Sequence, residues 1–179
     1  MKQRCHWAEN NNILIQQYHD HEWGVPCHDD QKLFEFLSLE IMQSGLSWQT
    51  ILKKRDNFKL AFSNWNINKI ANYNESTINN LLENQDIIRN RRKIQAIIHN
   101  AQIVLQIQLH QSFNHYIWQC SKFKTIKQNF DIQIDNNLST KVTTTMKQTG
   151  FKFIGPTIIE SFLEAIGVIN GHEPQCFLI

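Results

Sequence analysis

Two cysteines and two histidines near the ends of the chain have spacings that could serve a metal ion. Cys5 and His19 are separated by 13 residues, and His172 and Cys176 are separated by three. Two thiolates and two imidazoles would form a closed tetrahedral Zn2+ site, which would be structural because no ligand position stays open for chemistry. The alternative is four unrelated residues, with cysteine as a small buried hydrophobe and histidine as a surface group. Spacing alone leaves both interpretations open.

A second group of residues could bind a flat heterocycle. Glu40 lies late in a largely apolar segment, and it could be a partly buried carboxylate at the mouth of an aromatic pocket. The aromatic residues that could build this pocket are Trp7, Tyr18, Trp23 and Trp48. Aromatic faces stack on flat rings and attract cations. The alternatives are a solvated carboxylate at the rim and simple core packing of the tryptophans, which is the better interpretation for Trp65 and Trp118.

A cluster of cations suggests a third kind of chemistry, the binding of a polyanion. It lies in the stretch 81–101, just before apolar residues at helical spacing, and consists of Arg89, Arg91, Arg92 and Lys93. Cations are unfavourable at a helix N-terminus, where exposed N–H groups already carry partial positive charge. Backbone donors and side-chain cations at one place therefore suit a phosphate. The alternative is a solvated charged turn between two ordinary helices.

Length and composition are those of one ordinary globular domain. The chain has 179 residues, 41% of them hydrophobic and 19% charged. Its formal net charge is only +2, so a nucleic-acid interface would depend on local clusters. No run of about 18 apolar residues predicts a membrane span, and the first residues lack the apolar core of a signal peptide. We therefore expect a cytoplasmic protein without structural disulfides, in which Cys27 and Cys120 are structural residues.

The elements that position these residues are predicted to be helices. Asp29 and Asp30 offer an N-cap for the first, which ends at Ser44 and Gly45. Further helices are predicted at 48–55, 57–62, 66–71, 76–82, about 91–109, 113–118, 139–148 and 156–166. Residues 1–28 and 121–137 lack clear periodicity and are predicted to be irregular. The sum is one all-α domain over residues 1–179.

Taken together, these features resemble the DNA-3-methyladenine glycosylase I family, within the helix-hairpin-helix DNA glycosylases. The matching motifs are Arg4-Cys5-x-Trp7, Tyr18-His-Asp-x-Glu-Trp-Gly-Val-Pro26, Leu39-Glu40, Gly45-Leu-Ser-Trp48, Ile87-Ile-Arg89, Lys93-Ile-Gln-Ala-Ile-Ile98, Gly150-Phe-Lys-Phe-Ile-Gly155 and His172-x3-Cys176. They extend from residue 4 to 176, so the resemblance covers essentially the whole chain. It implies the helix-hairpin-helix DNA glycosylase fold, with a structural zinc that joins the N- and C-terminal segments.

The resemblance also implies a role for each matching residue. The zinc ligands would be Cys5, His19, His172 and Cys176. Glu40 would be the acid that binds the base, with the pocket aromatics Tyr18, Trp48, Trp7 and Trp23. Leu46 matches the residue expected to fill the gap left in the duplex, and Gly45 beside it is expected to contact DNA. The hairpin near 81–101, with Arg89, Arg91, Arg92 and Lys93, would grip DNA, and we expect further phosphate contacts from Lys53, Lys54 and Arg55.

Three positions depart from the family pattern. Glycines are expected where this chain has Asp86 and Arg92, and a hairpin turn often needs the positive φ that glycine supplies freely. A further aromatic of the pocket wall is replaced by Ile15. The chain also has no convincing counterpart of the catalytic aspartate of many helix-hairpin-helix glycosylases, because Asp131 and Asp135 lie in the irregular segment.

The function implied by the resemblance is DNA repair. The enzyme would flip 3-methyladenine out of double-stranded DNA, hydrolyse its N-glycosidic bond, release the free base and leave an abasic site. We expect a monomer that carries one structural Zn2+. The alternative is a zinc-stapled module that binds DNA or lesions without catalysis.

Overall fold

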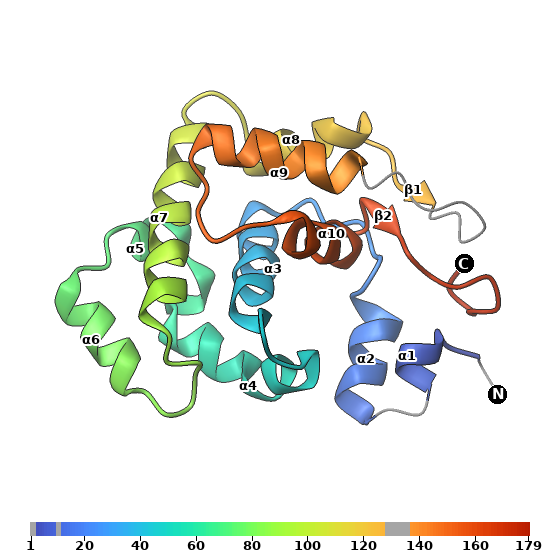
Figure 1. Ribbon diagram of the computed structural model, residues 1–179, viewed down its shortest axis with the longest axis horizontal. Coiled ribbons are helices and arrows are strands. Elements are labelled where there is room, and N and C mark those ends of the chain that lie inside the picture. The colour runs from blue at the N-terminus through green and yellow to red at the C-terminus, as the bar shows by residue number, and fades with distance from the viewer. Residues whose placement is uncertain (1–2, 10–11, 128–136) are drawn as a thin grey trace.

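The computed structural model describes residues 3–9, 12–127 and 137–179, and this part of the chain is almost entirely helical (Figure 1). The helices are α1 (His6–Glu9), α2 (Ile13–His21), α3 (Asp30–Gln43), α4 (Trp48–Ala61), α5 (Ile67–Ala71), α6 (Glu75–Glu83), α7 (Arg91–Gln108), α8 (Phe113–Trp118), α9 (Asn137–Thr149) and α10 (Pro156–Ala165). The other elements are the 3-10 helices η1 (Ser63–Trp65) and η2 (Gln119–Ser121) and the strands β1 (Ile126–Lys127) and β2 (Ile169–Asn170), which pair in parallel. The predicted all-α class is confirmed apart from this short ladder.

Helix α3 lies between α7 and α10 at the centre of the molecule (Figure 1). Every residue from Leu33 to Met42 is buried, so this helix is covered on all sides. It begins as predicted, because the Asp29 carboxylate accepts a hydrogen bond from the Lys32 N–H at 2.7 Å. Since α3 contacts α4, α7, α8 and α10, side chains near its C-terminal end are held between several elements.

The structure corrects two predictions. Helix α1, like α2, lies within the segment 1–28 that was predicted to be irregular. Residues 13–21 form α2 within the segment predicted to be irregular, and Asn12 begins this helix by accepting hydrogen bonds from the Leu14 and Ile15 N–H groups. Only a narrow face of α2 is buried, which is too few apolar positions for a periodic pattern. The separate helices predicted at 48–55 and 57–62 are one helix, α4. Asn57, interpreted as a helix start, lies inside it, and asparagine is only mildly unfavourable there.

A helix-loop-helix unit occupies the cation-rich stretch as predicted. Helix α6 ends at Glu83, α7 begins at Arg91, and the Asn90 side chain caps α7 by accepting a bond from the Lys93 N–H. Helices α9 and α10 form a second such unit, with Pro156 at the predicted first position of α10. Residues 128–136, which include Asp131 and Asp135, lie outside the described residues.

The N- and C-terminal segments lie side by side (Figure 1). The Phe177 N–H donates to the Gln3 carbonyl at 2.9 Å, and the His6 N–H donates to the Glu173 carboxylate at 3.0 Å. The termini are therefore joined directly. Among the described helices, none has the length and apolar character that crossing a membrane would require.

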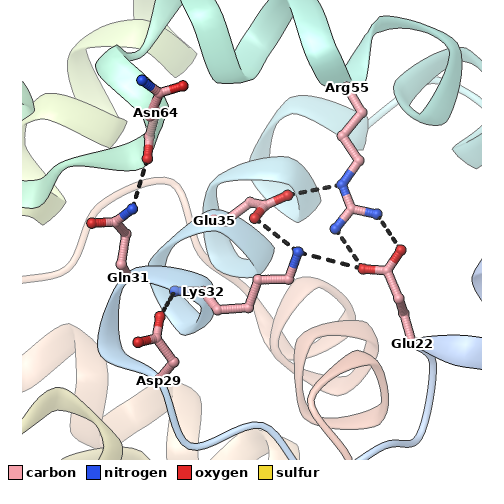
Figure 2. A network of polar contacts seen from close by, with 7 residues as sticks. All are labelled: Glu22, Asp29, Gln31, Lys32, Glu35, Arg55 and Asn64. Carbon is pink, nitrogen blue, oxygen red and sulfur yellow. Dashed lines mark hydrogen bonds and ion pairs between the residues drawn. The ribbon is translucent and has the colours of Figure 1, made fainter.

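A network of ion pairs joins α3 and α4 to the segment after α2 (Figure 2). Arg55 donates to both carboxylate oxygens of Glu22 at 2.7 Å and to Glu35 at 2.8 Å. Lys32 adds contacts to Glu35 at 3.0 Å and to Glu22 at 3.4 Å. The Arg55 side chain is only 15% exposed and pairs with two carboxylates of the same chain. It therefore stabilises the fold and is not placed for the phosphate contact expected from the sequence.

Candidate active site

The aromatic residues and the acid singled out in the sequence meet at one cavity of about 260 Å3. Its lining consists of Trp7, Tyr18, Trp23, Glu40, Gln43, Trp48, Ser161 and Glu164. These residues come from α1, α2, the segment after α2, α3, α4 and α10, so no single element forms the pocket. Ile15, which replaces an expected aromatic, is buried and is not part of the lining.

Two pairs of aromatic rings form the walls of the cavity. The Tyr18 and Trp48 ring centroids are 5.0 Å apart, and those of Trp7 and Trp23 are also 5.0 Å apart, nearly perpendicular at 82°. Tyr18 is buried, whereas Trp7 is 37% exposed and marks the outer side of the cavity. Ser47 caps α4 and thereby fixes the backbone at Trp48, the first residue of that helix. The Trp48 Nε1–H is buried and has no hydrogen-bond partner among the described residues.

Two carboxyl groups face this cavity, one from α3 and one from α10. Glu40 is 4% exposed, and burial together with the nearby charge of Glu164 raises its pKa to about 8. Burial, with a smaller effect of Glu160, raises the pKa of Glu164 to about 7. Within the described part of the chain, neither carboxyl group has a hydrogen-bond or ion-pair partner. A cation in the cavity would therefore be attracted, since it would favour the ionised form of both carboxyl groups and offset the cost of their burial.

Glu164, Gln43 and Ser161 were not identified in the sequence. Glu164 could have been found in the sequence, because it lies beside the apolar face of α10 just as Glu40 lies beside the apolar face of α3. That pattern alone does not separate a rim carboxylate from one facing a cavity. Only the packing of α10 against α3 makes the distinction.

A glycine-containing turn lies next to the cavity, at the end of α3. Gly45 has a φ of +81°, which glycine adopts readily, and a side chain there would meet no atom within 4 Å. Leu46 is 42% exposed, although it is apolar. A second hollow of about 300 Å3 is lined by Ser44, Gly45, Leu46, Thr157 and Ile158 and shares Glu40, Gln43 and Ser161 with the first. The exposed leucine and the acidic pocket are therefore adjacent.

The four cations of the stretch 81–101 have different environments. Arg89 and Arg92 are exposed, and Arg92 lines a surface hollow together with Lys152. Arg91 pairs with Glu75 and donates to the Asn79 amide oxygen at 2.6 Å. Lys93 is buried.

The two positions that replace expected glycines introduce no strain into this hairpin. Neither Asp86 nor Arg92 is among the described residues with positive φ. Arg92 lies within α7, and the Asp86 N–H donates to the Asn84 side chain at 2.9 Å. Both backbone conformations are therefore open to ordinary side chains.

The cysteine and histidine residues at the two ends of the chain also meet. The ligand atoms of Cys5, His19 and Cys176 all lie within 4.8 Å of one another and are buried, so this group could hold a metal ion. The His172 ring is 5.2 Å from that of His19, and its Nε2 is buried without a hydrogen-bond partner among the described residues. Both imidazoles use Nδ1 for a hydrogen bond, His19 to Asp20 at 2.9 Å and His172 to Asn170 at 2.8 Å. That arrangement turns both Nε2 atoms towards the group: Nε2 of His19 lies 3.5 Å from Cys176 Sγ and accepts a long hydrogen bond from the Cys5 N–H at 3.3 Å, and Nε2 of His172 is partnerless among the described residues.

Fold and site together define a helical protein with an aromatic, acidic cavity suited to a flat, cationic ring and with exposed cations suited to a polyanion. The model of the methyladenine glycosylase family matches residues 7–179, and the chain belongs to this family. It is 38% identical over 182 residues to DNA-3-methyladenine glycosylase 1 of Escherichia coli K12, covering 97% of this chain and 95% of that protein. A crystal structure of 3-methyladenine DNA glycosylase I is 41% identical with a TM-score of 0.91, covering 98% of both chains. A variant of such an enzyme, solved in complex with 3-methyladenine, is 34% identical with a TM-score of 0.91, covering 97% of this chain and 96% of that one.

Proposed function

We infer that this protein is a DNA repair glycosylase that flips 3-methyladenine out of double-stranded DNA and hydrolyses its N-glycosidic bond. The observation that carries this inference is the cavity in which two partnerless carboxyl groups face four aromatic side chains. Membership of the methyladenine glycosylase family supports the same reaction. We place the enzyme in the cytoplasm and expect it to act as a monomer.

The chemistry of the pocket matches the charge of the damaged base. Methylation at N3 makes the adenine ring cationic while it is attached to the sugar. Tyr18 and Trp48 would stack on this ring, with a cation–π contribution of roughly 0.5–2 kcal/mol. Glu40 would accept hydrogen bonds from the exocyclic amine and, with Glu164, offset the positive charge.

Hydrolysis of this bond makes modest demands on the protein. Water adds to C1′ of the sugar and gives up one proton to the solvent, the C1′–N bond breaks, and the base leaves with the electron pair as a neutral molecule. Because the ring already carries positive charge, it needs no protonation before it departs. Neutral adenine could enter the pocket and would remain a poor leaving group. The reaction is therefore compatible with a pocket whose acids bind the base rather than protonate it.

The DNA would lie across the face that carries the exposed cations. Arg89 and Arg92 are free to contact phosphates, and Lys152 is exposed beside Arg92. Helix α10 has no side-chain cap, so its first free N–H groups can donate hydrogen bonds to an anion near Leu46. Leu46 would occupy the space that the flipped nucleotide leaves in the duplex.

The site between the two ends of the chain would hold one structural Zn2+. Cys5, His19, His172 and Cys176 would be its ligands, which is supported by the partnerless Nε2 of His172 and by the Nδ1 hydrogen bonds of both rings. Burial raises the pKa of the Cys5 thiol to about 12, so metal binding would displace a proton there. When bound, the ion would connect the segment that carries Trp7 and Tyr18 to the C-terminal segment. It would supply no catalytic chemistry.

The deciding experiment is to incubate methylated duplex DNA with the wild-type protein and with Glu40→Ala, and to separate the released bases by chromatography. The wild type should release 3-methyladenine, and the variant should release far less. A Trp118→Phe variant, altered in the core away from the cavity, serves as a control for general loss of structure. If the wild type binds the methylated DNA tightly yet releases no base, the protein is the non-catalytic lesion-binding module instead.

A further inference from the structure

Lys93 has an environment unlike that of the other cations in the hairpin. Its side chain begins in the first turn of α7 and is 5% exposed. Its Nζ donates hydrogen bonds to the carbonyl oxygens of Met42 at 2.9 Å and Ser44 at 2.7 Å. Burial lowers its pKa from the ordinary value. The sequence placed this lysine among the phosphate contacts, but in the folded protein its donors face the C-terminal end of α3.

The electrostatics of this contact favour a cation at the end of α3. The last carbonyl groups of a helix lack intrahelical partners and carry partial negative charge. Lys93 supplies both the missing donors and the matching charge. The same side chain is unfavourable at the N-terminus of its own helix, so its position is explained by α3 and not by α7.

The carbonyl groups that Lys93 binds lie immediately before Gly45 and Leu46. A Cβ at Gly45 would meet no atom within 4 Å, and Leu46 is 42% exposed although it is apolar, so side-chain packing does little to hold this turn. The polar contacts that fix it are the two bonds from Lys93 and the bond from the Leu46 N–H to the Gln43 carbonyl at 2.7 Å. Removing the lysine would leave two carbonyl groups unsatisfied beside the base pocket.

We propose that Lys93 is a positioning residue that holds the turn 44–46, so that Leu46 is fixed for insertion into the duplex when the DNA is gripped by the hairpin. This proposal rests on the proposed glycosylase function. It connects two parts of the reaction, because the helix that carries the phosphate-binding Arg92 also fixes the residue that replaces the flipped base. Lys93 itself contacts no phosphate.

The test compares excision of 3-methyladenine from duplex and from single-stranded oligonucleotides by the wild type, Lys93→Met, Leu46→Ala and the double variant. Only the duplex leaves a gap that Leu46 can fill. The Lys93→Met variant should therefore lose roughly tenfold to a hundredfold in duplex excision and much less on the single strand. Because Lys93 acts through Leu46, the double variant should be no slower on the duplex than the slower single variant.

Two further measurements separate positioning from phosphate contact and from misfolding. The slope of log K for duplex binding against log salt should be unchanged in Lys93→Met, whereas loss of a phosphate contact would reduce it by about 0.9. Quenching of tryptophan fluorescence by free 3-methyladenine should be retained, which shows an intact pocket. If Lys93→Met does not fold, Lys93→Gln keeps one donor and should show the same duplex-specific loss to a smaller degree.

A reduced salt slope, or equal losses on both substrates in a folded variant, would overturn the proposal. Additive losses in the double variant would also overturn it. Failure of the wild type to excise from either substrate would instead refute the proposed function, so the two failures are distinguishable.

Discussion

Replacing Glu40 by glutamine should make the protein more stable at alkaline pH and a poorer enzyme. The carboxyl group is 4% exposed and has no hydrogen-bond or ion-pair partner among the described residues, so ionising it in the folded state is costly. Glutamine keeps the shape of the side chain and one oxygen acceptor without the charge. The substitution therefore isolates the effect of the buried charge.

The pKa of Glu40 gives the magnitude and the direction of the effect. Its value rises from 4.5 when unfolded to about 8 when folded. A group with a raised pKa stabilises the fold below its unfolded pKa, and that contribution is lost as the pH rises towards the folded pKa. At roughly 1.4 kcal/mol per pKa unit, burying Glu40 costs about 3 kcal/mol at pH 7, where the folded carboxyl group still keeps its proton, and about 5 kcal/mol well above pH 8, where it is ionised. The Glu40→Gln variant should avoid this cost, and its advantage over the wild type should vanish near pH 4.5.

Urea denaturation of both proteins between pH 5 and pH 9 measures this effect. Glu83→Gln, at an exposed position on α6, is the matched control and should track the wild type at every pH. Excision of 3-methyladenine by Glu40→Gln should fall by roughly tenfold to a hundredfold, because a hydrogen bond to a charged acceptor contributes about 1.5–3 kcal/mol. If the wild type and Glu40→Gln lose stability in parallel as the pH rises, the carboxyl group is not desolvated and the reasoning is refuted.

Three other substitutions test the remaining parts of the site. Glu164→Gln should lower the pKa of Glu40 by removing a like charge, so the acid limb of the kcat/KM profile should shift to lower pH. An unshifted limb would show that the charge of Glu164 does not affect the ionisation of Glu40. Cys176→Ala should lose the one equivalent of zinc detected by elemental analysis and should unfold at a markedly lower temperature; full retention of zinc would refute the ligand set. Arg92→Ala should weaken duplex binding and reduce its salt slope by about 0.9, whereas Arg91→Ala, which breaks a contact with α6, should leave the slope unchanged.

The sequence by itself predicted most of the helices and five of the eight residues that line the cavity. Helix starts at Asp29, Ser47 and Pro156 could be predicted because capping chemistry is local and depends on a few neighbouring residues. The family motifs then indicated that Glu40 and four aromatic residues belong together, and the structure brings these five to one cavity. Helix α2 was missed because its buried face is too narrow for a periodic pattern.

Only the tertiary structure decided what each charged residue does. Arg55, Lys93 and Arg92 are all cations near predicted DNA contacts, yet Arg55 pairs with two carboxylates, Lys93 binds carbonyl groups of α3, and Arg92 faces solvent. Glu164 likewise became a pocket residue only through the packing of α10 on α3. The physical reason is that the charge and contacts of a side chain depend on burial and on partners from distant segments. Neighbouring residues in the sequence do not specify those partners.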